Sequence, residues 1–372
     1  MIYLDNAATS YPKPPSVIDA VSNALAYCGN PGRSAHSLAM FSAEQIFSCR
    51  QIISSYFHYL YPEHIIFTLN ATYAINIAIH ALYEEGCHVL ISDLEHNAVY
   101  RPISQLAREG RITFDIVSHK GDFLQNIKCA ITPRTKMMVC TQASNVTGEA
   151  LPIKEIGAFC YAHNVKLIID ASQSAGHLPV HLDETKFDAF CAPAHKGLYG
   201  IQGAGFLILN NQNILRDFIS GGTGSDPFSD HMPLYLPERF EAGTPATPAI
   251  AGLAEGIRFL EDTKDNQKHL SVMTAWMHDE FSLLPLVRLH SSKDNPCGIL
   301  SFSCDRLQGQ LMDAYHMQDI CVRDGFHCAP LAHKCIGTDK IGCIRASIGA
   351  HTKQDDIEKF ISFTRKWLLA NG

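Results

Sequence analysis

Charged residues are scarce in this chain, and it has neither a basic surplus nor a long apolar run. Asp, Glu, Lys and Arg make up 18% of the 372 residues, below the roughly 25% usual for soluble domains, whereas apolar residues reach 46%. That balance excludes a disordered chain. Thirty Lys plus Arg against 37 Asp plus Glu give a formal charge of -7, which offers no general attraction to nucleic acid or anionic lipid. We therefore expect neither nucleic acid nor a membrane as a partner.

Nothing in the sequence predicts a secretory leader or a membrane span. The first ten residues, MIYLDNAATS, lack a basic segment followed by an apolar stretch, and no window approaches the roughly 18 apolar residues that cross a bilayer. Thirteen cysteines are scattered from Cys28 to Cys343 without a Cys-x-x-Cys pair, which fits reduced thiols better than a disulfide framework. We expect a cytoplasmic protein in which most thiols pack as small apolar residues.

Short runs rich in Val, Ile and Phe alternate with stretches of helical period. Helices are predicted near residues 72–83, 97–109 and 153–164, and seven runs predict strands at 64–68, 87–92, 112–118, 137–143, 166–171, 187–192 and 205–210. This alternation is typical of an α/β fold with a mainly parallel sheet and helices on both of its faces.

The length predicts two or three domains at about 150 residues each. We place a large α/β domain at residues 13–250. The segment 221–248 is dense in Gly, Pro, Asp and Ser, and it predicts a long surface excursion that ends in EAGTPATP. After it, helical patterns and two short apolar runs predict a smaller α+β domain, formed by residues 251–372 together with residues 1–12.

Two polar residues at predicted strand ends could carry chemistry. Asp170 closes the run KLIID, and parallel sheets bind ligands at the carboxyl ends of their strands. Lys196 precedes the glycine-rich GLYGIQGAGF, where packing against the sheet would favour the neutral amine that a Schiff base needs. Taken singly, Asp170 is more often a helix cap and Lys196 a solvated surface lysine. Together, with His96, Gln173 and His195 at neighbouring strand exits, they indicate a catalytic site.

At these residues the sequence resembles the fold-type I pyridoxal-phosphate enzymes, within them the class V aminotransferase group that contains the cysteine desulfurases. The matching motifs span nearly the whole chain in the family's order: YLDNAATS, FTLNATYAIN, EHNA, SNVTGE, DASQSAGH, AHKGLYGIQGAG, RFEAGTPATP, RDGFHCAPLAH and IRASIGA.

The resemblance implies pyridoxal 5'-phosphate as the cofactor, bound covalently by Lys196, with Asp170 paired to the ring nitrogen. His96 would stack on the ring and move a proton at the substrate thiol, and Gln173 would bond the phenolic oxygen. The other implied cofactor contacts are Ala71, Thr72, Asn145, His195 and Thr244. Thr244 would come from the opposite subunit, so the resemblance also implies a homodimer.

Two positions depart from the family's usual phosphate contacts. Asn70-Ala71-Thr72 stands where relatives often have Gly-Thr-Thr, and Pro193 stands where they often have a serine. Backbone groups at a helix start would then supply more of the phosphate binding.

The reaction that the resemblance implies depends on Cys328 and Arg345. RDGFHC resembles the Arg-x-Gly-x-His-Cys loop of group II desulfurases, related to selenocysteine lyase, and positive neighbours favour the thiolate of such a cysteine. The guanidinium of Arg345 suits the carboxylate of an amino-acid substrate, with Asn145 close to that substrate. We expect conversion of L-cysteine to L-alanine with a persulfide on Cys328, which then passes to an acceptor protein.

Other functions stay open at this point. Selenocysteine lyase or a class V aminotransferase would use the same scaffold, and a non-catalytic zinc- or partner-binding module would explain the Cys- and His-rich region near residues 321–343 differently. Structural zinc sites usually pair ligands two to four residues apart in two knuckles. No such pair of knuckles is present, so we expect no metal.

Overall fold

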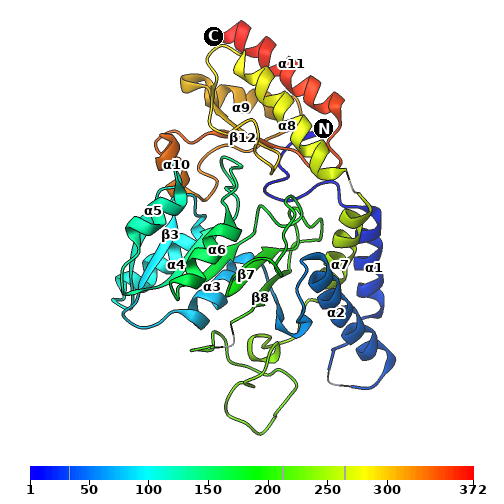
Figure 1. Cartoon of the computed structure of the whole chain (residues 1–372). Coiled ribbons are helices and arrows are strands. Elements are labelled where there is room, and N and C mark those ends of the chain that lie inside the picture. Colours follow the sequence, from blue (N-terminus) through cyan, green and yellow to red (C-terminus); the bar gives the residue numbers. More distant parts are fainter. Residues whose placement is uncertain (33, 212, 264) are drawn as a thin grey trace.

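A seven-stranded sheet occupies the centre of the protein, which we describe from a computed structural model covering residues 1–32, 34–211, 213–263 and 265–372 (Figure 1). The strand order is β2-β8-β7-β6-β5-β3-β4. The bounds are β2 Ile65–Thr68, β3 His88–Ser92, β4 Thr113–Val117, β5 Thr135–Thr141, β6 Lys166–Asp170, β7 Ala189–Pro193 and β8 Gly205–Leu209. All seven predicted strands are therefore present in one sheet.

Five of these strands run parallel, from β4 to β7, and only β8 is antiparallel to both of its neighbours. The prediction of a mainly parallel sheet is confirmed. Because β3, β5, β6 and β7 point the same way, the segments that follow them emerge at one edge of the sheet.

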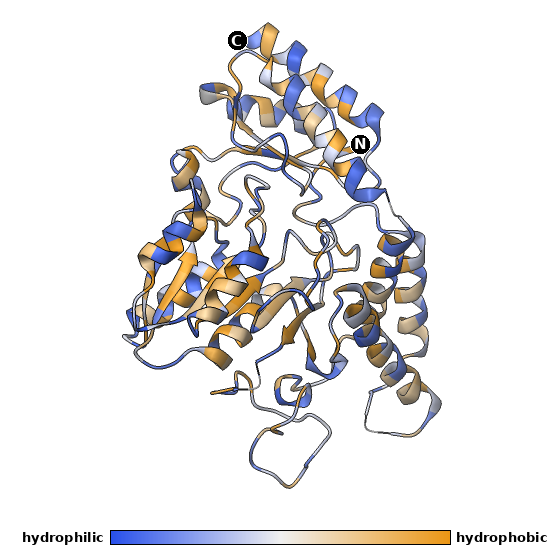
Figure 2. Ribbon diagram, viewed as in Figure 1, coloured by the Kyte–Doolittle hydropathy of each residue, from blue (hydrophilic) through white to orange (hydrophobic). Residues whose placement is uncertain are grey.

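Helices cover both faces, as predicted, because alternate strand residues face opposite sides. Ile168 of β6 packs in one cluster with α3 (Ala71–Leu82) and α4 (Asn97–Arg108). Its neighbours Leu167 and Ile169 pack in a second cluster with α2 (Ser37–Tyr56), α5 (Phe123–Ala130), α6 (Ile153–Ala162) and α7 (Thr247–Asp262). Figure 2 shows the strands as hydrophobic, in keeping with a sheet buried on both sides.

A third apolar cluster lies in the C-terminal part of the chain and includes Leu4 from the N-terminus. Strand β1 (Ile2–Tyr3) pairs with β11 (Ile320–Cys321), and β12 (Ile344–Ser347), β10 (Ile299–Ser303) and β9 (Arg288–Leu289) form a small antiparallel sheet. The helices here are α8 Asn266–Ser282, α9 Gln308–Met317, α10 Pro330–Ile336 and α11 Gln354–Asn371. The predicted domain boundaries themselves stay a prediction.

Several helices were not predicted, among them α1 (Pro15–Tyr27), α2, α5 and α10. Helix α2 has polar residues mixed into its apolar stripe, and it is stabilised by packing against α7 rather than by a strong helical period. The segment after β8 is largely irregular up to α7, apart from a short 3-10 helix at Glu238–Phe240. No helix in the described part of the chain combines the length and apolar character of a membrane span.

Candidate active site

A pocket of about 100 Å³ opens where β3, β5, β6 and β7 end. Its walls come from the segments after these strands and from the start of α3, an edge at which parallel sheets bind ligands. The lining residues are Asn70, Ala71, Thr72, His96, Ala98, Thr141, Ala143, Asn145, Asp170, Ser172, Gln173, Pro193, His195 and Lys196. Most of the sequence-predicted cofactor residues thus line one cavity.

Lys196 and Asp170 supply opposite charges to this pocket. Asp170 is the last residue of β6 and is buried, and its Oδ1 accepts a hydrogen bond from the Ser172 backbone N–H at 2.9 Å. Burial lowers the pKa of Lys196 to about 8, and the nearby charge of Asp170 opposes that shift. The amine is therefore far easier to deprotonate than that of a solvated lysine, whose pKa is about 10.4.

The two pocket histidines are neutral at physiological pH. Burial, followed by the charge of Lys196, lowers the pKa of His96 and of His195 to about 4. His96 caps α4, and its Nδ1 accepts a hydrogen bond from the Ala98 N–H at 3.0 Å. Since Nδ1 acts as an acceptor, the ring proton of neutral His96 resides on Nε2.

Two fully buried side-chain atoms of the pocket residues have no hydrogen-bond partner among the described residues. They are Gln173 Oε1 and His195 Nδ1, both buried. The other end of the Gln173 amide is fixed, because Nε2 donates to the Ala7 carbonyl at 2.9 Å. A buried amide oxygen without a partner is costly, so this pocket is built to receive a polar ligand.

Cys328 lies on a loop that contacts the pocket residue Asn145. The thiol is exposed, and Cys328 and His327 both adopt left-handed backbone conformations, with φ of 56° and 46°. Two hydrogen bonds hold this turn: the Asn97 N–H donates to the Cys328 carbonyl, and Asn145 Nδ2 donates to the His327 carbonyl, each at 2.7 Å. Cys328 is close enough for its charge to affect the pKa of Lys196.

Arg345 is buried at the start of β12 beside the same loop. One guanidinium nitrogen donates to the Asn145 carbonyl and the other forms an ion pair with Asp5, both at 3.0 Å. Its Nε has no partner among the described residues. Asn145 therefore contacts both the Cys328 loop and Arg345, which the sequence alone did not indicate.

Thr244 is the one predicted cofactor residue that lies elsewhere. It lines a separate cavity of about 150 Å³ with Leu69, Tyr73 and Phe240. A more spacious depression, about 690 Å³, is at the opposite edge of the sheet near Lys166 and Asp188. We assign the active site to the pocket of about 100 Å³, because Lys196, Asp170 and His96 are buried there and affect one another's charge.

Sequence reasoning missed the N-terminal segment as part of the site. The carbonyl of His195, directly before Lys196, accepts hydrogen bonds from the Ser10 N–H, the Thr9 and Ser10 hydroxyls and Lys13 Nζ, at 3.0 to 3.2 Å. These donors fix the peptide that carries the pocket lysine. The motif YLDNAATS was the available signal, but it gives no indication of where the segment folds.

The fold and this lysine-centred pocket agree with the comparison to known families. The chain belongs to the class-V aminotransferase family, whose model matches residues 2–360. Among curated relatives, it is similar to a probable cysteine desulfurase of Methanothermobacter thermautotrophicus, at 30% identity over 96% of this chain and 92% of the relative. A probable cysteine desulfurase of Staphylococcus aureus is 27% identical over 97% of this chain and 91% of its own. The family resemblance drawn from the motifs is confirmed.

Solved structures support the same fold. The apo cysteine desulfurase of Thermococcus onnurineus NA1 aligns with a TM-score of 0.89 at 26% identity, covering 99% of this chain and 95% of the other. A cysteine desulfurase of Escherichia coli in an S-sulfonic acid form aligns with a TM-score of 0.88 at 22% identity, covering 99% and 94%. The predicted fold-type I architecture is therefore confirmed.

Proposed function

We propose that this protein is a pyridoxal-phosphate-dependent cysteine desulfurase that converts L-cysteine to L-alanine and holds the sulfur as a persulfide on Cys328. The observation that carries the proposal is that Lys196 and Asp170 line one pocket while the loop of Cys328 is bound to the pocket residue Asn145. Family membership and the names of the curated relatives support it.

The pocket residues fit pyridoxal phosphate. Lys196 offers an amine with a lowered pKa for the aldehyde, and the carboxylate of Asp170 suits a protonated ring nitrogen. The unpartnered oxygen of Gln173 is an acceptor for the protonated phenolic group. At the start of α3 the first N–H groups have no intrahelical partner and favour a phosphate. Gly205 of β8 allows the start of α3 to lie close to the sheet, because a Cβ there would lie 2.7 Å from the Asn70 carbonyl carbon.

The remaining cofactor roles that we propose follow the sequence predictions. Ala71 and Thr72 would bind the phosphate through backbone and hydroxyl groups, with help from His195. His96 would cover the ring face, and Asn145 would lie between cofactor and substrate. Pro193 lines the pocket at the end of β7 and has no N–H or hydroxyl to donate to a phosphate. The phosphate would therefore depend on the N–H groups at the start of α3.

When bound, pyridoxal phosphate supplies an electron sink that stabilises negative charge at the substrate α-carbon. The amine of Lys196, with its pKa lowered to about 8, would serve as the base that removes the α-proton. The carboxylate of Asp170 would pair with the ring nitrogen and favour its protonated form. Arg345 would hold the substrate carboxylate, and the Nε2–H of neutral His96 would donate a hydrogen bond at the substrate sulfur.

Sulfur transfer itself requires a nucleophile at Cys328. Its thiolate attacks the substrate sulfur, so that a sulfur–sulfur bond forms while the Cβ–sulfur bond breaks. The electron pair of the broken bond stays with the carbon skeleton, which takes up a proton and leaves as alanine. The enzyme keeps a persulfide, which an acceptor thiol or an external reductant then removes.

The direct test is to incubate the purified protein with L-cysteine and a thiol reductant and to measure alanine and sulfide together. We expect equal amounts of both products. Alanine or pyruvate formed only when a keto acid is supplied would contradict the proposal and favour an aminotransferase. The same assay with L-selenocysteine tests the selenocysteine lyase alternative. A turnover much higher than with L-cysteine would make selenocysteine the substrate.

The lowered pKa of Lys196 predicts how the cofactor-free protein takes up pyridoxal phosphate. Only the neutral amine attacks the aldehyde, so the association rate should rise about tenfold per pH unit up to about pH 8 and then level off. In Asp170→Asn the charge that raises this pKa is gone, so the plateau should begin at lower pH. A rate that still climbs above pH 9.5 would mean an ordinary solvated lysine. Stopped-flow absorbance measures these rates.

Arg345→Lys tests the proposed carboxylate contact. Lysine keeps the charge near Asp5 but loses the planar, two-pronged donor, so we expect kcat/KM for L-cysteine to fall about 10²-fold, mainly through KM. Arg288→Lys, on the exposed β9, is the matched control and should leave the kinetics unchanged. An unchanged KM in Arg345→Lys would remove this residue from substrate binding.

We also propose a cytoplasmic homodimer that acts on a free amino acid and delivers sulfur to an acceptor protein. No disulfide is present among the residues that the structure describes, which suits a reducing compartment. Thr244 lies outside its own chain's pocket, beside the exposed apolar side chains of Leu69 and Tyr73, and would complete the site of a second copy. The division into a large domain at 13–250 and a small domain at 1–12 and 251–372 belongs to the same proposal.

A further inference from the structure

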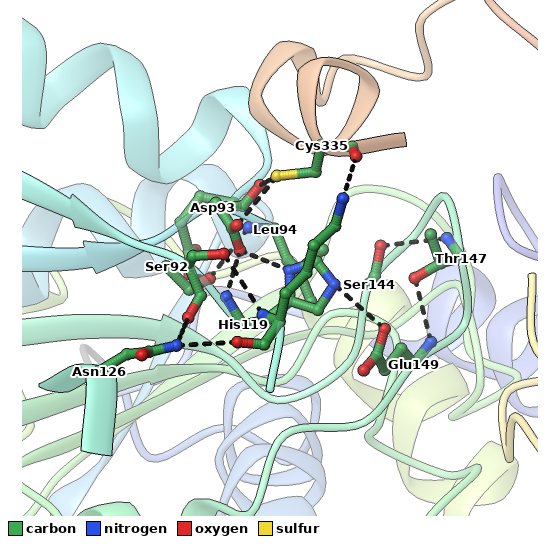
Figure 3. A network of polar contacts seen from close by, with 12 residues as sticks. Ser92, Asp93, Leu94, His119, Asn126, Ser144, Thr147, Glu149 and Cys335 are labelled. Carbon is green, nitrogen blue, oxygen red and sulfur yellow. Dashed lines mark hydrogen bonds and ion pairs between the residues drawn. The ribbon is translucent and has the colours of Figure 1, made fainter. Parts of the chain in front are cut away.

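A second cluster of reactive side chains lies outside the active site. Asp93 follows β3, His119 follows β4, and Cys335 is in α10, so three distant segments meet there (Figure 3). One potential ligand atom from each residue lies within 4.8 Å of the others. None of these residues has a role in the proposed desulfurase reaction.

The contacts within the cluster are close and directed. Asp93 uses one carboxylate oxygen to accept from His119 Nδ1 at 2.7 Å and the other to accept from Cys335 Sγ at 2.9 Å. On the far side of the ring, His119 Nε2 lies 3.3 Å from Glu149 Oε2. Asp93 is buried, and the side chain of His119 is only 8% exposed. The cluster is therefore preorganised, with a solvent side at Glu149, whose side chain is 45% exposed.

The charges in the cluster match a divalent cation. The ring of His119 lies between the carboxylates of Asp93 and Glu149, at 2.7 and 3.3 Å, and its protonated form supplies one positive charge. With Lys120, whose amine donates to the Cys335 carbonyl at 2.6 Å, the two carboxylates are balanced by two positive charges. One divalent ion would replace the protons of His119 and Cys335, so the net charge would stay at zero.

We propose that Asp93, His119 and Cys335 form a binding site for Zn²⁺. Carboxylate oxygen, imidazole nitrogen and thiolate sulfur are the ligands this ion prefers, at about 2.0–2.3 Å. Tetrahedral ligands at such lengths lie roughly 3.3–3.8 Å apart, so the three side chains need only separate slightly. His119 binds through Nδ1 while its Nε2–H donates to Glu149, which orients the ring from behind. A water molecule would complete the tetrahedral set.

This site differs from the two-knuckle zinc site whose ligand spacing is absent from the sequence. Zinc knuckles have ligands close together in the chain, whereas residues 93, 119 and 335 come from three segments that only folding brings together. The bound ion would tie α10 to the ends of β3 and β4. Because α10 begins two residues after Cys328, the same ion would fix one end of the reactive loop.

Zinc binding to the purified holoenzyme tests the proposal. After extensive dialysis against a chelator, titration with ZnCl₂ followed by metal analysis should give one tightly bound ion per chain. Co²⁺ in its place should give the ligand-field bands of a tetrahedral site with a sulfur ligand. Cys335→Ser and His119→Gln should each weaken Zn²⁺ binding about 10²-fold or more, and Glu149→Gln about tenfold. Affinity should also drop as the pH falls, because protons compete for His119 and Cys335.

Two control variants locate the ion. Cys129→Ser removes an exposed thiol on α5 and should leave binding unchanged. Cys343→Ser tests the neighbouring buried cluster of His327, His333 and Cys343, and it should also keep the ion. Absence of saturable binding at one Zn²⁺ per chain would overturn the proposal. So would loss of the ion in Cys343→Ser with retention in Cys335→Ser. Neither result depends on desulfurase activity.

Discussion

Replacing Lys196 with alanine should lower alanine production from L-cysteine by about 10³-fold or more and abolish covalent attachment of the cofactor. The variant removes both the amine that attaches to the aldehyde and the base that we propose for the α-proton, and a general base alone contributes about 10²–10⁴-fold. Borohydride reduction followed by peptide mass spectrometry should find the pyridoxyl group on Lys196 in the parent protein and on no peptide of the variant.

The control for this experiment is Lys186→Ala. Lys186 is an exposed lysine over the ring of Tyr161, remote from the pocket, and its loss should leave the pyridoxyl label and the turnover unchanged. A label that persists in Lys196→Ala would assign the cofactor to another lysine and would remove the basis of the proposed site.

Replacing Cys328 with alanine should separate cofactor binding from sulfur transfer. The variant keeps the pocket, so its visible absorption and its borohydride-fixed label should match those of the parent. Sulfide and alanine release should fall by about 10³-fold or more, because the variant lacks the nucleophile that takes the sulfur from the substrate. Mass spectrometry of the parent under limiting reductant should find one extra sulfur atom on the peptide that contains Cys328.

Cys321→Ala is the matched control for the thiol. Cys321 lies seven residues before Cys328, on the short strand β11, and it is half-buried. Its loss should leave both product formation and the persulfide label intact. Full desulfurase activity in Cys328→Ala would refute the persulfide step while leaving the Lys196 assignment standing.

Much of the seven-stranded sheet could be predicted because most of its strands are buried on both faces. Such strands are continuous apolar runs, and the runs that include β3 and β6 are distinct from the helical stretches around them. Helices without a clear apolar period were not predicted, as α2 illustrates. Its 20 residues are stabilised by contacts with α7, more than 190 positions later, and no local pattern reports such a partner.

Part of the active site could also be predicted from the sequence, for a related reason. Asp170 ends a recognisable strand, Lys196 and His96 stand shortly after two others, and parallel strands place their ends at one edge of the sheet. Contacts made from other parts of the chain had no such signal. The donors at residues 9–13 that bind the His195 carbonyl, and the pairing of Asp5 with Arg345, follow from how the N-terminus folds back.

By itself, the sequence determined the α/β class, the strands, the family and the residues at the strand ends, because periodicity and motif spacing are local properties of the chain. Only the tertiary structure decided that Asn145 links the Cys328 loop to Arg345, that burial lowers the pKa of Lys196, and that Asp93, His119 and Cys335 meet. Desolvation and contact between distant segments arise from packing, which no local pattern records.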